Sequence, residues 1–110
     1  MAKQINFGFD GKEYTLEYTR RSIQQMEQQG FTIGDVEKKP MTVLPELFAG
    51  AFIAHHKFAK RDVIDGIYAN MTDKQDLLNK LSEMYADPIM ALMEEPEEDE
   101  EKNVKWEANF

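Results

Sequence analysis

Two adjacent histidines, His55 and His56, are the residues of this 110-residue chain best suited to metal binding or acid–base chemistry. Neighbouring residues of a helix point about 100° apart, whereas two metal ligands on one helix face need a spacing of three or four. The chain has no cysteine, and no Asp or Glu stands at ligand spacing from the pair. Because His55 also falls on an apolar stripe, we interpret it as a core or interface histidine.

Other patterns that could support catalysis are weak. The only serines, Ser22 and Ser82, lie neither in a nucleophile elbow nor beside a histidine, and the six glycines form no phosphate-binding loop. The acidic run Glu94–Glu101 lacks EF-hand spacing and is typical of a solvated linker. We therefore predict a protein that is not an enzyme and has no metal site and no cofactor. The alternative, an enzyme with an unfamiliar site, would depend on the two histidines together with Asp62 and Asp65.

Charge is distributed unevenly along the chain. Residues 1–93 hold 11 Lys and Arg against 13 Asp and Glu, a net charge of −2, whereas residues 94–110 hold 2 Lys against 8 acidic residues, a net charge of −6. A surface that binds phosphates would need the opposite sign, so nucleic acid is not an expected partner. No apolar run approaches the roughly 20 residues of a membrane span, and the N-terminus does not resemble a signal peptide. We expect no membrane association and a cytoplasmic location.

The N-terminal segment INFGFDGKEYTLEYT predicts a β-hairpin over residues 4–19. Apolar residues alternate with polar or small ones on both sides of Asp10-Gly11, a pair that favours a two-residue turn with positive φ at both positions. Such a turn places Phe7 opposite Tyr14 and gathers the apolar residues on one face. A lone hairpin is only marginally stable in water, so this face should pack on other elements.

Apolar residues at helical spacing predict four helices, about 20–29, 43–60, 62–71 and 73–93. Their expected start signals are Thr19 or Ser22, Thr42, Asp62, and Thr72 with Gln75. Gly30 is placed to end the first helix, with Phe31 packing back on Met26. The second helix is apolar on most sides and should form the centre of the core. Asp87-Pro88 should interrupt the last helix, because the residue before a proline disfavours helical geometry.

Two groups of residues could bind a protein partner. Met84, Met90 and Met93 form a methionine cluster before the acidic run, and methionine adapts to varied apolar surfaces. Trp106 and Phe110 belong to a period-two alternation that predicts a short docking strand. This strand could add to the hairpin edge, to another copy or to another protein. The alternative is a frayed, disordered terminus.

The predicted fold class is α+β, mostly α. A β-hairpin packs on a bundle of about four helices within a single domain, residues 1–93. Residues 94–110 are an acidic linker followed by the terminal docking segment.

The chain resembles the small tail assembly chaperones of long-tailed bacteriophages and prophages, in the short form. The resemblance covers most of the length and depends on FDGKEYTLEYTRRSIQQMEQQGF, MTVLPELFAGAFIAHHKF and an acidic tail ending in VKWEANF. It implies a mostly helical, self-associating protein that shields the tape measure protein and helps recruit the tail tube protein. The alternative is another phage structural or adaptor protein, such as a head–tail connector component.

Overall fold

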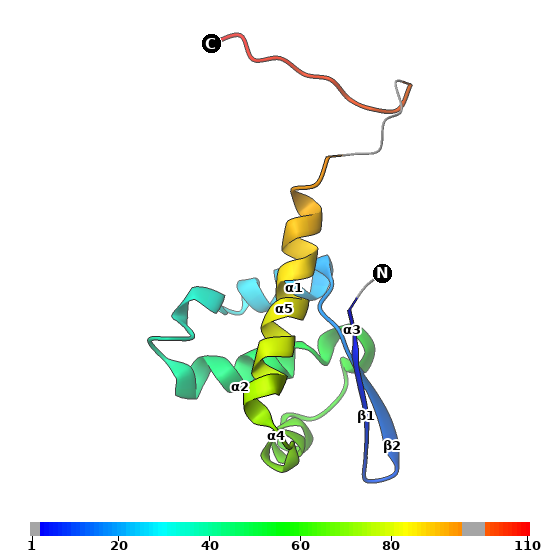
Figure 1. The fold of residues 1–110 in the computed structure, drawn as a ribbon, viewed down its shortest axis with the longest axis vertical. Coiled ribbons are helices and arrows are strands. Elements are labelled where there is room, and N and C mark those ends of the chain that lie inside the picture. Colours follow the sequence, from blue (N-terminus) through cyan, green and yellow to red (C-terminus); the bar gives the residue numbers. More distant parts are fainter. Residues whose placement is uncertain (1–2, 96–100) are drawn as a thin grey trace.

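The chain folds as an antiparallel β-hairpin followed by helices, as the sequence pattern predicts (Figure 1). The computed structural model describes residues 3–95 and 101–110. The predicted fold class, α+β and mostly α, is confirmed. The elements, in chain order, are β1 (Ile5–Phe9), β2 (Lys12–Leu16), α1 (Arg20–Gln28), the 3-10 turn η1 (Ile33–Asp35), α2 (Pro40–Gly50), α3 (Ile53–His56), α4 (Arg61–Asn70) and α5 (Lys74–Leu92).

The hairpin has the predicted register. Phe7 lies opposite Tyr14 and Ile5 opposite Leu16. The turn residues Asp10 and Gly11 have φ values of 53° and 78°, the left-handed pair that joins two twisted strands through a two-residue loop. Turn chemistry and apolar alternation therefore agree on one pairing.

Both ends of α1 are closed by local hydrogen bonds. Thr19 and Ser22 cap each other's backbone N–H groups at the start of the helix. At the other end Gly30 has a φ of 94°, and the N–H of Phe31 donates to the carbonyl of Met26 over 3.0 Å. This is the Schellman arrangement that the sequence predicts.

The core lies between the apolar face of the hairpin and the helices. Aromatic rings connect the layers: Tyr14 lies 5.8 Å from Phe52 between ring centroids, Phe52 lies 5.2 Å from Phe48, and Phe48 lies 5.0 Å from Tyr68. Met26 packs over Gly50, where a Cβ would come within 2.3 Å of its Cε. This close approach brings α1 onto α2 and explains a glycine inside a helix.

The predicted helix 43–60 is wrong in its extent. Residues 51–52 separate α2 from α3, and helical structure starts at Pro40 and ends at His56. At the break the carbonyl of Ala51 accepts the N–H of Glu17, 3.1 Å away, so the residue that follows strand β2 takes a bond that a continuous helix would make internally. Because α2 starts at Pro40, the prediction that Thr42 caps this helix was also wrong.

The predicted interruption at Asp87-Pro88 is also wrong, because α5 runs through Pro88 without a break. Its N-cap is Asp73, with a φ of 50° and no side-chain capping bond, in place of the predicted Thr72 and Gln75. The cap of α4 is likewise Lys60 rather than Asp62.

Residues 103–110 have no regular secondary structure and run clear of the folded body (Figure 1). The predicted terminal strand is therefore absent from the isolated chain. The acidic linker lies partly outside the described residues, since positions 96–100 are not among them.

Candidate protein-binding surface

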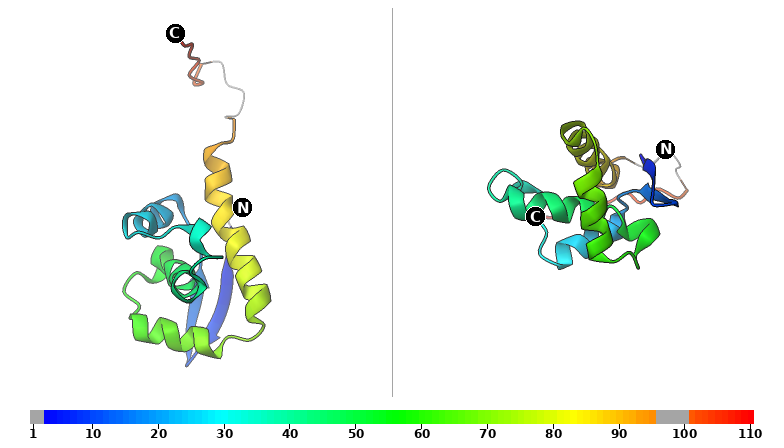
Figure 2. Two further views of the ribbon diagram at one scale, coloured as in Figure 1. Left: turned by 90° about the vertical axis from the view of Figure 1, so that its left-hand side faces the viewer. Right: turned by 90° about the horizontal axis from the view of Figure 1, so that it is seen from below.

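The most prominent apolar surface gathers where α5 leaves the body. Ile89, Met90, Leu92 and Met93 are 44%, 64%, 57% and 81% exposed. We call these four residues the apolar end of α5. In the two side views this end of the helix projects past all other elements of the body (Figures 1 and 2).

The apolar end continues a stripe that is buried earlier in the same helix. Leu81 and Tyr85 are 2% and 4% exposed. Ile89 follows Tyr85 by four positions and Leu92 follows it by seven, so both lie on the same helix face as the buried residues. Tyr85 is therefore the last residue of this stripe that the folded body buries.

Aromatic side chains from the first third of the chain cover the helix up to Tyr85. The ring of Tyr85 lies 5.1 Å from that of Tyr18 and 5.8 Å from that of Phe31. A salt-bridge cluster flanks the same stretch of α5: Lys3 Nζ lies 3.2 Å from Glu83 and 3.3 Å from Asp87. The hydrogen bonds that Lys3 donates to Glu83 and to Asp87, in that order of size, raise the pKa of Lys3. Pairs this exposed hold the N-terminus only loosely.

The predicted methionine cluster is divided by the structure. Met84 is 2% exposed and belongs to the core, so its assignment to a binding surface was wrong. Its position three residues after Leu81 placed it on the inner stripe, a signal that the sequence already contained. Met90 and Met93 are exposed, and their role in binding stays a prediction.

The predicted docking residues of the terminal segment are fully accessible. Trp106 is 83% exposed, and Phe110 is as exposed as in an extended chain. Neither belongs to the core cluster of the described residues. They lie outside the body, separated in sequence from the apolar end of α5 by the acidic run.

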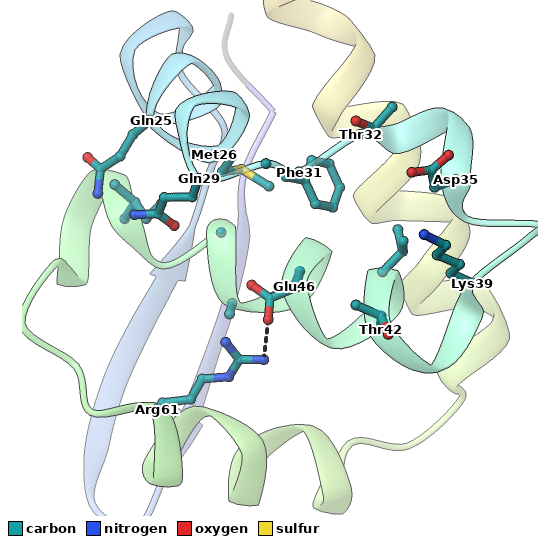
Figure 3. Close-up of a pocket in the computed structure, with 15 residues that line it drawn as sticks. Gln25, Met26, Gln29, Phe31, Thr32, Asp35, Lys39, Thr42, Glu46 and Arg61 are labelled. Atoms are coloured by element: carbon teal, nitrogen blue, oxygen red, sulfur yellow. Dashed lines mark ion pairs between the residues drawn. The ribbon is translucent and has the colours of Figure 1, made fainter.

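A hollow of about 530 Å³ lies between α1, η1 and α2 (Figure 3). Its walls combine apolar groups such as Met26 and Ile53 with polar groups such as Gln29. Arg61 on its rim is paired with Glu46 over 3.0 Å, and this hydrogen bond, followed by the one that Arg61 donates to Asp65, raises the pKa of Arg61. The charge of Arg61 is therefore already neutralised by its acidic partners.

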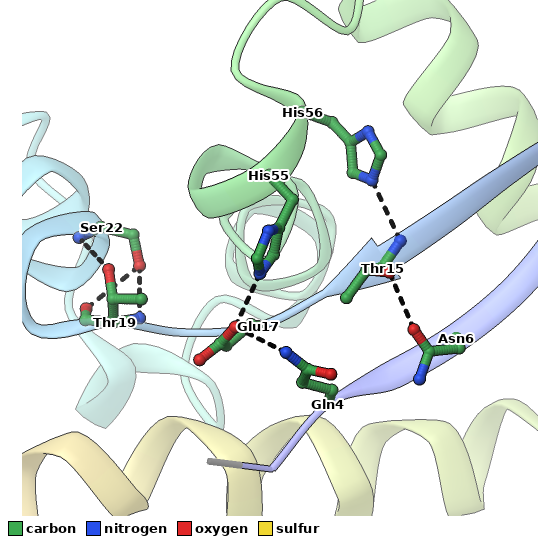
Figure 4. A network of polar contacts seen from close by, with 8 residues as sticks. All are labelled: Gln4, Asn6, Thr15, Glu17, Thr19, Ser22, His55 and His56. Atoms are coloured by element: carbon green, nitrogen blue, oxygen red, sulfur yellow. Dashed lines mark hydrogen bonds and ion pairs between the residues drawn. The ribbon is translucent and has the colours of Figure 1, made fainter.

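His56 covers the outer edge of strand β2, and His55 contacts the side chain of Glu17 just past the end of this strand (Figure 4). The backbone N–H of Thr15 donates to Nε2 of His56 over 3.0 Å, and Nε2 of His55 lies 2.6 Å from a carboxylate oxygen of Glu17. His56 is half-buried while His55 is exposed, which corrects the expectation that His55 was the inward residue. Sequence reasoning missed this edge-sealing role, because it depends on a contact 41 residues apart.

These contacts shift two pKa values. The hydrogen bond from His55 lowers the pKa of Glu17. Burial, with smaller contributions from Lys12 and His55, lowers the pKa of His56. Because Nε2 of His56 accepts a backbone N–H, the ring is neutral in this arrangement.

Within residues 3–95 and 101–110, no three His, Asp or Glu side chains converge as they would around a metal ion. None of the helices described has the length and hydropathy of a bilayer span.

Comparison with known proteins gives a single match. No curated protein and no solved structure is similar to the chain. Residues 1–110 match one family, described as "Domain of unknown function (DUF5055)". The match covers the whole length, and the chain therefore belongs to this DUF5055 family.

Proposed function

We propose that this protein is a non-catalytic assembly chaperone that covers an exposed apolar stripe on a partner helix. The observation that carries the proposal is the apolar end of α5, where a stripe buried up to Tyr85 continues into solvent at Ile89 and Leu92. An amphipathic helix from a partner would complete the packing that the body supplies earlier along α5.

The resemblance to phage tail assembly chaperones gives this partner an identity. A tape measure protein presents long apolar helix faces that would aggregate before tube subunits surround them. A small protein with an adaptable surface of methionine and branched aliphatic residues suits such a partner, with many copies along one chain. The setting would be the cytoplasm of the bacterial host.

The acidic segment supports the same role. Residues 94–110 carry a net charge of −6, and charge of one sign keeps a coated complex soluble. Each contact of the apolar end is small, so affinity would be collective and individual copies could dissociate when the tube assembles.

Co-expression with the tape measure protein of a tail gene cluster tests the proposal. The tape measure protein should be soluble with the wild-type chain and should aggregate with a chain carrying Ile89→Ser and Met93→Ser. Met41→Ser is the matched control, because Met41 is 90% exposed on α2, away from the apolar end.

A tape measure protein that stays equally insoluble with and without the wild-type chain would refute the chaperone function. Equal protection by the Ile89→Ser, Met93→Ser chain would refute the assigned surface. The alternative of a head–tail connector or adaptor requires the protein to remain in finished tails, whereas a chaperone leaves.

A further inference from the structure

The two outer edges of the hairpin differ in whether their backbone N–H and C=O groups form hydrogen bonds. On β2 the N–H of Thr15 donates to His56, and just past the end of this strand the N–H of Glu17 donates to the carbonyl of Ala51. On β1, the pairing register turns the N–H and C=O groups of Asn6 and Gly8 outward. In the part of the chain that the structure describes, no hydrogen bond reaches these outward groups.

The apolar face of the hairpin is only partly covered along the same edge. Ile5 and Phe7 on β1 are half-exposed, whereas their cross-strand partners Leu16 and Tyr14 are buried. An edge with free backbone groups and a half-exposed apolar row is able to accept one more strand.

The terminal segment has the features of such a strand. It runs as an extended chain away from the body (Figure 1), and Val104, Trp106 and Phe110 stand at even spacing with exposures of 83% or more. Residues two apart lie on one face of a strand, so all three can cover a single apolar surface.

We propose that residues 103–110 of one copy add to β1 of a second copy as a third, antiparallel strand. With Trp106 opposite Phe7, this pairing places Val104 opposite Phe9 and extends the apolar face by one strand. Trp106 and Phe7 then form a non-hydrogen-bonded pair, the arrangement with the closest side chains. The proposal stands apart from the tape measure role, since it uses different surfaces.

Charge on the opposite face favours the antiparallel direction. The carboxylate of Glu13 lies over Gly8, where a Cβ would be 3.2 Å from its Oε1. Antiparallel addition with Trp106 opposite Phe7 brings Lys105 beside Gly8 and within reach of this carboxylate. Parallel addition would instead bring Glu107 there, and like charges on adjacent strands repel.

The antiparallel direction also favours addition of the terminal segment of a second copy over addition of the chain's own terminal segment. Lys3 contacts Asp87, so β1 starts near the C-terminal half of α5 and its far end lies about 30 Å from Met93, counting strand and helix rise. In an antiparallel pairing the terminal segment must begin beside that far end of β1. The ten residue-to-residue steps from Met93 to Asn103 span at most about 35 Å, which leaves almost no slack within one chain. A segment from another copy has no such restriction.

Disulfide formation between introduced cysteines tests the proposed strand addition directly, because the chain has no cysteine of its own. Asn6 and Glu107 face each other in the proposed register at about 5.5 Å between Cα atoms, within disulfide range. A mixture of an Asn6→Cys chain and a Glu107→Cys chain should form a mixed disulfide dimer under mild oxidation. Ala108→Cys is the matched control, since its side chain points to the other face and should not pair with Asn6→Cys.

Two association measurements by sedimentation complete the test. Trp106→Ser should weaken self-association at least about tenfold. Glu13→Lys and Lys105→Glu should each weaken it about two- to fivefold, and the double variant should restore it.

Three results would overturn the proposal. The first is a full-length chain that stays monomeric up to millimolar concentration. The second is an internal disulfide in a chain carrying both Asn6→Cys and Glu107→Cys, with none between separate chains. The third is equal crosslinking by the Ala108→Cys control.

Discussion

The two halves of α5 carry the same apolar stripe but have opposite surroundings. In the first half Leu81 and Tyr85 pack into the core, while in the second half Ile89 and Leu92 face solvent. The spacing is helical throughout, so periodicity identifies the face of the helix but not the molecule that covers it. The first half is covered by its own chain. For the second half, the described residues supply no cover, and we assign that role to a partner.

The largest expected difference between the two halves of α5 is in the effect of a Leu→Ala substitution on the free energy of unfolding. Leu81→Ala should lower the free energy of unfolding by about 2–4 kcal/mol, because it leaves a cavity in the core. Leu92→Ala should change it by less than about 0.5 kcal/mol, because Leu92 is 57% exposed. Urea denaturation of both variants measures the difference. Equal losses would mean that the second half is buried in the isolated chain.

Pro88 lies at the boundary between the halves and gives the next largest effect. Since α5 continues through it, Pro88→Ala restores one hydrogen bond and removes a clash, and should raise the free energy of unfolding by about 1–2 kcal/mol. Part of the gain is offset by lost packing of the half-buried ring. An unchanged stability in urea would indicate that the helix is interrupted there.

Acidification should lower the free energy of unfolding through groups in the body, and the apolar end of α5 should not contribute to this change. The pKa of His56 is lowered from 6.5, so its contribution is complete above pH 6.5 and is lost as pH falls through the lower folded-state value. The pKa of Glu17 is lowered from 4.5, so its contribution is lost only below pH 4.5. Each contribution should be below about 1 kcal/mol because both groups are partly solvated.

Urea titrations at a series of pH values check this order. His56→Gln should remove the loss between neutral pH and pH 5, and Glu17→Gln should reduce the loss below pH 4.5. A pH dependence above pH 5 that is identical in the wild type and His56→Gln would contradict the edge contact with Thr15.

Removal of the terminal segment should have the smallest effect on stability. A chain ending at Glu94 should unfold with the same free energy as the full chain within about 0.5 kcal/mol, because Trp106 and Phe110 make no core contact. Its self-association should be weakened. A stability loss above 1 kcal/mol, measured by urea denaturation at low protein concentration, would show that the segment docks on its own body.

Local sequence signals predicted the elements whose structure is decided locally. Asp10-Gly11 fixed the hairpin register, and Gly30 with Phe31 ended α1, because turn and cap geometry depend on adjacent residues. The same signals did not separate Met84, which is buried, from Met90 and Met93, which are exposed, although the sequence grouped all three in one binding cluster.

Long-range contacts decided what the sequence did not predict. At the break between α2 and α3 the Ala51 carbonyl bonds to the N–H of Glu17, just past strand β2, a partner that helical periodicity cannot reveal. Pro88 remains within a helix because packing of the turns before it overrides local preference. The terminal alternation predicted a strand, but a strand forms only beside another strand, and residues 101–110 have none in the isolated chain.

Hydrogen exchange of α5 with and without a tape measure helix tests the central claim most directly. Amides of residues 77–86 should be protected in both states, whereas amides of residues 89–93 should exchange rapidly in the free chain and gain at least about tenfold protection in the complex. Unchanged exchange at residues 89–93 in a complex that demonstrably forms would contradict the assignment of this surface to a partner.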